Sequence, residues 1–208
     1  MIRRIALLLA LAGTATAAEL KLPNPGFEPR VPSLDASWVS FEFGEAGSVS
    51  RIKRSKDART GRGALELAVH GGAGGQGVYV DAPVSGLKEG DKITFGIHAK
   101  TKGGIPMRDA SIGLHIEFLD SPGPDAAILA RTDTLGSSAF AGKGLTDQFR
   151  RQSTTHTLRD DEIPGGAEAV KVLRFVIVAL QPESRKAYER LGVVILDDAS
   201  AKLQRHGN

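Results

Sequence analysis

Acidic side chains are the first candidates for chemistry, because paired carboxylates can serve as the acid and the base of a glycoside hydrolase. Glu117 and Asp120 lie three residues apart, and residues 160–162 form the acidic run Asp-Asp-Glu. Neither group lies in a motif that would fix its geometry, so a solvated loop is the better interpretation of both. The chain also lacks the G-x-S-x-G and H-E-x-x-H motifs of hydrolases. We therefore predict that the protein is not an enzyme.

Several other site chemistries are excluded by composition and spacing. The chain has no cysteine, which rules out thiol nucleophiles, thiolate zinc sites and disulfides. His70, His156 and His206 are too scattered to have the spacing of zinc ligands. The glycine-rich segment at 71–77 is not a phosphate-binding loop, because no Gly-Lys-Ser/Thr follows it and no helix is expected to begin there.

The first residues have the pattern of a secretory signal peptide. Met1–Arg4 is basic, Ile5–Ala12 is an apolar run, and small residues follow as far as Ala17. The apolar run is shorter than the ~20 residues that a membrane-spanning helix needs. We expect a signal peptide at 1–17, cleaved after Ala17 or Ala18, and a secreted or periplasmic protein. An uncleaved anchor is the alternative.

Little positive charge remains after the signal. The whole chain has a formal net charge of +3, and loss of Arg3 and Arg4 lowers it to +1 because no acidic residue is removed with them. The basic runs at 51–54 and 150–151 are short and are expected on solvated strand faces. The mature chain therefore lacks the basic surface that nucleic-acid binding requires.

The segments that must position any site have the two-residue hydrophobic period of β-strands. In residues 93–99, for example, Ile93, Phe95 and Ile97 alternate with polar residues and glycine, so that one face packs inward. Strands are expected at 38–43, 64–69, 77–81, 93–99, 111–118, 151–158, 170–180 and 193–196.

Other structure is expected to be sparse. Residues 183–191 form the one expected helix, and residues 120–147 are expected to be irregular. The chain contains 25 glycines, which suit tight turns between short strands. We predict one domain over residues 19–204 with an all-β fold, an antiparallel two-sheet β-sandwich.

Several motifs then occur in an order that resembles a known family. They are Asn24–Glu28, Trp38, Asp57–Leu67, Gln76–Val80, Leu87–Phe95, Ile116–Asp120, Phe149–Arg151 and Val194–Ala199. In this order the chain resembles the carbohydrate-binding modules of the family 4, 9 and 22 type, over nearly all of its mature length. The resemblance implies a galactose-binding-like β-jelly roll that binds carbohydrate without catalysis.

The same resemblance implies a structural calcium ion near the two ends of the domain. Modules of this kind often hold calcium between the first strand, a loop before a tight turn, and the last strand. The matching groups are the Gly26 and Thr60 carbonyls and the carboxylates of Glu28, Asp57 and Asp197. Such a mixture of oxygens suits calcium. Asp198 could replace Asp197, because a one-residue shift exchanges the faces of a strand. Otherwise these acids are ordinary surface carboxylates.

The related modules bind sugars on the outward face of the concave sheet. The residues implied for that face here are Gln76, Tyr79, His98, His115, Glu117 and Arg174, with Trp38 as an alternative platform to Tyr79. The sequence departs from the family at residues 71–75, where glycines stand in place of an aromatic residue before the glutamine. Trp38 is expected to be a core or rim anchor, and most phenylalanines are expected to face the core.

We therefore predict a secreted, non-catalytic protein that recognises a glycan or polysaccharide through one sheet face. Two alternatives remain open. One is a structural or protein-interaction β-sandwich without a sugar site, which the low aromatic content of 5% favours. The other is a lyase or glycosidase built on the same scaffold.

Overall fold

The structure is a computed structural model, and it describes most of the chain after the expected signal peptide. The described residues are 17–29, 38–44, 51–70, 74–104, 111–123, 125–132, 139–141, 145–180 and 190–207. The expected signal at 1–17 therefore lies outside the described residues except for Ala17. No helix within these ranges has the length and apolar character needed to cross a membrane.

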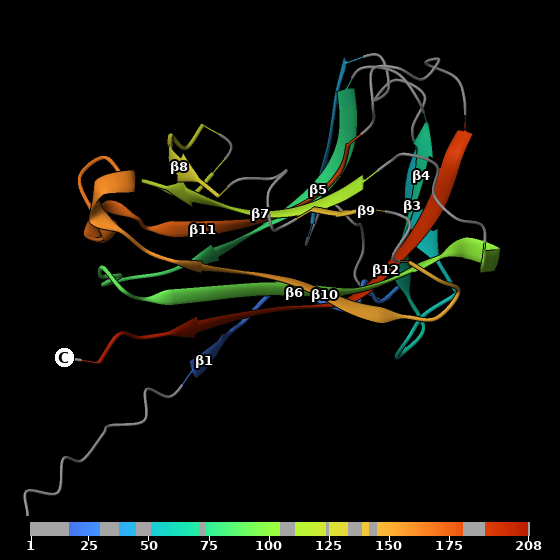
Figure 1. Cartoon of the computed structure of the whole chain (residues 1–208), viewed down its shortest axis with the longest axis horizontal. Coiled ribbons are helices and arrows are strands. Elements are labelled where there is room, and N and C mark those ends of the chain that lie inside the picture. The colour runs from blue at the N-terminus through green and yellow to red at the C-terminus, as the bar shows by residue number, and fades with distance from the viewer. Residues whose placement is uncertain are drawn as a thin grey trace, which may run out of the picture.

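Two antiparallel sheets face each other to form the predicted β-sandwich (Figure 1). Sheet A has the strand order β10-β6-β12-β4-β3, with β1 also paired to β12. Its strands are β10 (Arg150–Thr157), β6 (Lys92–Thr101), β12 (Arg190–Gln204), β4 (Ala64–His70), β3 (Arg51–Ser55) and β1 (Ala17–Leu20).

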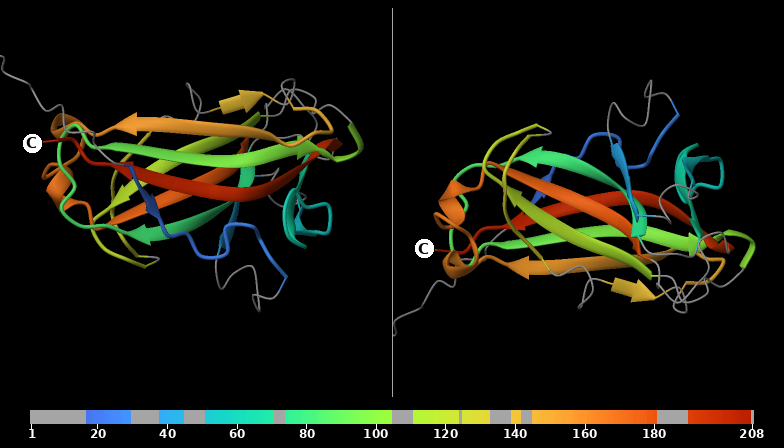
Figure 2. Two further views of the ribbon diagram at one scale, coloured as in Figure 1. Left: turned by 90° about the horizontal axis from the view of Figure 1, so that it is seen from below. Right: turned by 90° about the horizontal axis from the view of Figure 1, so that it is seen from above.

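Sheet B has the order β2-β5-β11-β7-β8, with β9 also paired to β7. Its strands are β2 (Val39–Phe43), β5 (Gly74–Pro83), β11 (Val172–Leu180), β7 (Ser111–Leu119), β8 (Ile128–Arg131) and β9 (Ala139–Ala141). Figure 2 shows the layers from both sides: β10, β6 and β12 lie next to one another in one view, and β5, β11 and β7 in the other.

The core fills the space between the sheets, as the alternating pattern predicts. Phe95 of β6 and Phe175 of β11 meet across it with ring centroids 5.0 Å apart, and both are fully buried. Trp38 is also fully buried, and its indole N–H donates to the carbonyls of Pro23 and Asn24. The expectation that Trp38 is a core anchor is confirmed, and its role as a sugar platform is excluded by its burial.

The two ends of the domain meet in sheet A. Ala17–Leu20 pairs with Ala201–Gln204, so the first and last described strands are neighbours. The Arg205 side chain and the His206 backbone N–H, just beyond β12, donate to the buried carboxylate of Asp91. Backbone pairing therefore brings the two chain ends together, and the buried Asp91 holds the C-terminal segment beside β6, without a disulfide.

Some sequence expectations need correction. The region at 120–147, expected to be irregular, contains β8 and β9, which are too short for a clear alternating pattern. Most of the helix expected at 183–191 lies outside the described residues, but Arg190 and Leu191 belong to strand β12, so the helix is wrong at its end. β12 is also far longer than the expected strand at 193–196, because a bulge between Asp197 and Ser200 lets it bend and continue.

Candidate functional site

The outer face of sheet B carries a row of aromatic side chains, of which Phe43 is exposed and Phe41 and Tyr79 are half-buried. Strand pairing places Phe41 and Phe43 of β2 opposite Gly77 and Gly75 of β5. Tyr79 lies on the same face, two residues beyond Gly77. The ring centroids of Phe43 and Phe41 are 6.4 Å apart with planes 13° from parallel, and those of Phe41 and Tyr79 are 6.3 Å apart. We call Phe43, Phe41 and Tyr79 the ring row.

Glycines make room for two of these rings. A Cβ atom on Gly77 would lie 2.5 Å from Phe41 Cζ, and one on Gly75 would lie 2.9 Å from Phe43 Cζ. Each phenylalanine therefore reaches from β2 over the backbone of β5, into space that a side chain on β5 would fill. The two rings therefore lie over Gly75 and Gly77, the residues on either side of Gln76 in the sequence.

A network of charged side chains adjoins the ring row. The Arg174 guanidinium donates from Nε and Nη2 to the two carboxylate oxygens of Asp81, at 2.7 and 3.0 Å. Its Nη1 lies 3.9 Å from Glu117, whose other oxygen is 3.3 Å from His115 Nε2. The guanidinium carbon is 4.1 Å from the centroid of the Tyr79 ring, which links the network to the rings.

Three residues of the network are much more deeply buried than the Phe43 ring. Arg174 is 8% exposed, Glu117 9% and His115 7%, whereas Phe43 is 46% exposed. Hydrogen bonds from Arg174 to Asp81 raise the pKa of the guanidinium, which outweighs the loss of hydration on burial. Arg174 is therefore a permanently charged group whose charge is already satisfied by two carboxylates.

Four of the six residues proposed from the sequence lie together on this face: Tyr79, His115, Glu117 and Arg174. The other two do not. Gln76 is 2% exposed and donates to the Ala68 carbonyl of sheet A, so it points into the sandwich. His98 belongs to β6 in sheet A, where it pairs with Asp197 and Arg151. The expectation that one face carries all six is wrong for these two residues.

His98 has its own environment on the outer face of sheet A. Burial lowers its pKa, and the positive charges of Arg59 and Arg151 lower it further. Its Nδ1 is buried without a hydrogen-bond partner among the described residues. The imidazole is therefore held neutral, on the opposite side of the molecule from the ring row.

The residues implied for calcium are partly brought together where the ends of the domain meet. A Cβ atom on Gly26 would lie 3.7 Å from carboxylate oxygens of Glu28, Asp197 and Asp198 alike. Asn24, Phe27 and Asp198 all have positive φ angles, which are strained for residues other than glycine. Three carboxylates and a strained backbone thus surround one point.

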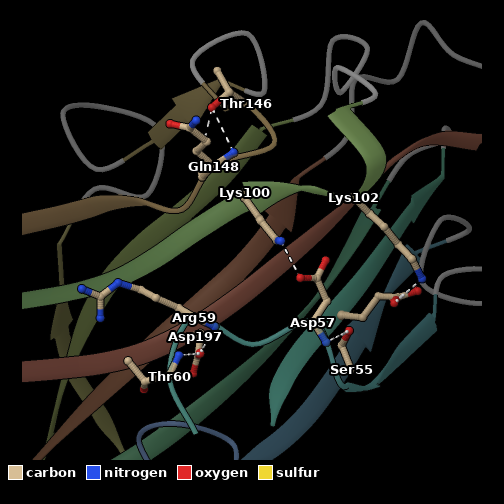
Figure 3. Close-up of polar contacts among 10 residues, drawn as sticks. Ser55, Asp57, Arg59, Thr60, Lys100, Lys102, Thr146, Gln148 and Asp197 are labelled. Carbon is tan, nitrogen blue, oxygen red and sulfur yellow. Dashed lines mark hydrogen bonds and ion pairs between the residues drawn. The ribbon is translucent and has the colours of Figure 1, made fainter. Parts of the chain in front are cut away.

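These carboxylates are held by hydrogen bonds from the turn at Thr60. The Arg59 and Thr60 backbone N–H groups donate to Asp197 Oδ2, at 2.7 and 3.1 Å (Figure 3). The Arg62 N–H donates to both oxygens of Glu28. Burial raises the pKa of Asp197, although the hydrogen bonds from the Thr60 and Arg59 N–H groups act to lower it. A nearby cation would favour the ionised form of this acid.

Asp57, the remaining proposed ligand, has a different partner. Figure 3 shows the Lys100 ammonium directed at Asp57, with which it forms an ion pair. Within the described part of the chain, no group of three or more His, Cys, Asp or Glu residues is arranged to hold a metal ion. Asp198 is likewise ion-paired, with the Arg59 guanidinium at 2.7 Å. Calcium would therefore require Glu28, Asp197 and Asp198 to move closer together and Asp198 to leave Arg59, and Asp57 would join only after leaving Lys100.

The acidic groups considered for catalysis have structural partners. Asp120 accepts the hydroxyl of Ser121 and the N–H of Ala127, which shapes the turn before β8. Asp161 forms a two-bond pair with the Arg159 guanidinium on the surface. These contacts give both acids a role in local structure.

Sequence reasoning missed Phe41 and Phe43, because most phenylalanines were expected to face the core. Phe41 is partly exposed and Phe43 clearly so. A signal was present in the spacing: Val39, Phe41 and Phe43 share one strand face, and Gly75 and Gly77 have the same two-residue spacing on a later strand. Only pairing of β2 with β5 shows that these two patterns face each other.

No protein-family model matches the sequence, and comparison with curated proteins gives no match. Solved structures do match. The CBM22-1 xylan-binding domain of Paenibacillus barcinonensis Xyn10C has a TM-score of 0.51 at 12% identity, covering 93% of this chain and 99% of that domain. The CBM22-1–CBM22-2 tandem of the same protein has a TM-score of 0.53 at 13% identity, covering 95% of this chain and 48% of the tandem.

The active domain of tailspike protein 4 from bacteriophage CBA120 also matches, with a TM-score of 0.53 at 12% identity. That match covers 85% of this chain but only 20% of the tailspike chain, so this chain spans a small part of the phage protein. At these identities the likeness concerns the fold. This chain has the β-sandwich fold of the carbohydrate-binding modules.

Proposed function

We propose that this protein binds an uncharged glycan chain on the outer face of sheet B, without catalysing a reaction on it. The observation that carries the proposal is the solvent-accessible ring row lying directly beside the Asp81–Arg174–Glu117 network, with Phe43 exposed and Phe41 and Tyr79 half-buried. Aromatic rings offer a flat apolar surface for the C–H faces of pyranoses, and the carboxylate of Asp81 and the hydroxyl of Tyr79 can bond sugar hydroxyls. The fold shared with a xylan-binding domain supports it.

Charge supports an uncharged ligand. The formal charges of Asp81, Glu117 and Arg174 sum to −1. Nε and Nη2 of Arg174 donate to Asp81, Nη2 also donates to the Gly123 carbonyl, and Nη1 lies 3.9 Å from Glu117. Because Asp81 occupies the Nε–Nη2 edge of the guanidinium, that edge is not available to the carboxylate of a uronic acid. The pairing of Arg174 with Asp81 also argues against a lyase site at this position, because a lyase needs a cation to neutralise the substrate carboxylate while a base removes the neighbouring proton.

The accessible rings also favour binding over the alternative of a purely structural sandwich. Phe43 and Val39 are among the few large apolar residues that stand exposed in the described structure, and they share strand β2. A structural module has no need to hold rings at its surface over a pair of glycines. A protein-interaction module remains the alternative that binding experiments must separate.

Binding to polysaccharides tests the proposal directly. The protein is incubated with insoluble xylan, cellulose and mannan and with polygalacturonate, and bound protein is measured after sedimentation. We expect retention on at least one neutral polymer and none on polygalacturonate. Tyr79→Ala should weaken binding about threefold to tenfold, the effect of one aromatic contact.

His98→Ala is the matched control, because His98 lies on sheet A, and its binding should equal that of the unaltered protein. Absence of binding to every neutral polymer would defeat the proposal. Release of reducing ends or unsaturated sugars would establish an enzyme instead. Melting temperatures of both variants check that the fold is intact.

We also propose a structural calcium ion held by Glu28, Asp197 and Asp198, with carbonyl oxygens of Gly26 and Thr60. Carboxylate and carbonyl oxygens are the donors that calcium prefers. The ion would join the segment after β1, the turn before β4 and the bulge of β12, which are already linked by hydrogen bonds to Asp197 and Glu28. Export through the signal peptide, to the periplasm or the medium, is likewise a proposal that rests on residues 1–17.

A further inference from the structure

We infer that the bound glycan runs lengthwise along the edge strand β2, over Phe43, Phe41 and Tyr79 in that order, rather than across the strands of sheet B. This inference rests on the proposed function and specifies its ligand: an unbranched stretch of at least three sugar units. It follows from three features of the described residues: the direction of the ring row, the lack of rings and polar side chains on the line that crosses the sheet at Phe41, and the position of the polar groups.

The ring row follows the strand direction. Two residues along a strand advance about 6.6–6.8 Å, so the 6.4 Å between Phe43 and Phe41 is the strand repeat itself. The next step in the same direction along β2 is Val39, which pairs with Tyr79. The third ring therefore continues the row at a similar spacing of 6.3 Å while moving one strand inward.

A path across the sheet at the level of Phe41 offers no comparable contacts. Register places Gly77, Val178 and Gly113 in line with Phe41 on successive strands. None of the three has a polar side chain, and Val178 is only 3% exposed. A sugar lying across these strands would find neither a ring nor a hydrogen-bonding side chain on that line.

A path along β2 meets all three rings and the accessible acid of the network. Beyond Tyr79 on β5 comes Asp81, whose side chain is 28% exposed and therefore accessible to a sugar hydroxyl. The apolar and exposed end of the row, at Phe43, thus leads to a polar end at Asp81. Gly75 and Gly77 permit this arrangement, because a side chain at either would displace the ring that covers it.

An oligosaccharide length series tests this orientation. Xylo-, cello- and manno-oligosaccharides of two to six units are titrated calorimetrically into the full protein. In the series that binds, affinity should rise steeply up to three or four units and then level off, because each ring adds one contact. Phe43→Ala and Phe41→Ala should each lower affinity for the four-unit sugar about threefold to tenfold.

A second pattern identifies the order of the rings. Phe43→Ala should remove the gain between the shorter and longer sugars, since Phe43 contacts the terminal unit, whereas Phe41→Ala should weaken sugars of every length. Phe41→Leu is the second variant, for the case in which Phe41→Ala folds poorly. It keeps an apolar side chain but removes the ring, so it should show the same loss of binding. Ile128→Ala, an equally exposed apolar residue on β8 at the other edge of sheet B, is the control and should bind normally.

The outcomes separate the two proposals. Normal binding by both phenylalanine variants, together with weak binding by Tyr79→Ala, would overturn the lengthwise orientation and leave glycan binding intact. Affinity that does not depend on length would also overturn it, because a single ring would then suffice. If no neutral oligosaccharide or polysaccharide binds the unaltered protein, both the orientation and the proposed function are wrong.

Discussion

Each sheet carries a charge cluster on its outer face, and the two clusters are built in opposite ways. On sheet B a buried cation, Arg174, is surrounded by Asp81 and Glu117. On sheet A a buried anion, Glu66, is bonded by Lys53 at 3.2 Å and Lys102 at 2.8 Å. The partners differ in exposure: the side chains of Lys53 and Lys102 are 61% and 48% exposed, whereas that of Glu117 is 12% exposed.

This difference indicates what each face does. On sheet A the apolar residues of the outer face, Val193 and Ile195, are buried beneath Phe149, over which the Lys100 ammonium lies at 4.7 Å. That face is closed by its own side chains. On sheet B the Phe43 ring is exposed and the Phe41 ring is half-buried, beside a network whose Arg174, Glu117 and His115 are buried. This combination of accessible rings and buried charges is the reason why we propose sheet B, and not sheet A, as the glycan-binding face.

The largest stability effect should come from breaking the sheet B network. Asp81→Ala would leave Arg174 buried without its two-bond partner. We expect a loss of about 3 kcal/mol in the free energy of unfolding, the lower end for a broken buried pair because Asp81 is partly exposed. Urea unfolding followed by the fluorescence of Trp38, the single tryptophan, measures this loss.

The Arg159–Asp161 pair is the matched control for that experiment. It has the same two-bond geometry, but both side chains are about two-thirds exposed, at 65% and 67%. Asp161→Ala should leave stability unchanged within error, because water replaces the lost contact. Equal effects of the two variants would mean that Arg174 is solvated, and that the two faces do not differ in the way described above.

Calcium should have the next largest effect, beside the bulge of β12 in sheet A. Saturating calcium at about 100 times its dissociation constant would stabilise the fold by about 2.7 kcal/mol. We expect chelation to lower the melting temperature of the intact protein, and Asp197→Ala to remove the difference. Asp57→Ala is the informative companion: it should retain the calcium response, because Asp57 is paired with Lys100. Identical melting curves with and without chelator would show that no calcium ion stabilises the fold.

The smallest effect should come from the sheet A cluster. Burial disfavours ionised Glu66, but hydrogen bonds from Lys102 and Lys53 outweigh this and lower its pKa below the ordinary value of 4.5. The pair therefore stabilises the fold above pH 4.5, and this stability is lost as pH falls through the lowered pKa. Glu66→Gln should cost about 1–2 kcal/mol at pH 7, since the lysines are exposed and can turn to water.

Urea unfolding of Glu66→Gln and the unaltered protein from pH 7 to pH 3 checks this sign. The difference between the two should shrink in acid, and Glu168→Gln, an exposed acid, should show no difference at any pH. A gap that grows in acid would contradict the assignment of Glu66 as the ionised partner. Glycan binding should be unchanged in Glu66→Gln, because its cluster lies on the other sheet.

Much of the fold could be predicted because alternation reports burial directly. The pattern in residues 93–99 and 111–118 depends only on which side chains avoid water, and both segments are the expected strands. The bulge after Asp197 and the short strands β8 and β9 could not be foreseen, since a register shift or a four-residue strand leaves no periodic signal.

The site divides in the same way. Tyr79, His115, Glu117 and Arg174 share a face because each lies in outward phase on a predicted strand of one sheet. His98 has the same kind of phase, but the alternation in its strand does not say to which sheet that strand belongs. Gln76 lies on the inward face of β5, and its buried amide is partly satisfied by one hydrogen bond to the Ala68 carbonyl.

By itself the sequence determined which side chains face the core, that the strands pair in antiparallel sheets, and that no cysteine chemistry operates, since these follow from local periodicity and composition. Only the tertiary structure decided which strands are neighbours. The pairing of β2 with β5 turned two glycines and two phenylalanines, more than thirty positions apart, into the ring row. Contacts between distant segments depend on register and sheet order, which local side-chain patterns do not encode.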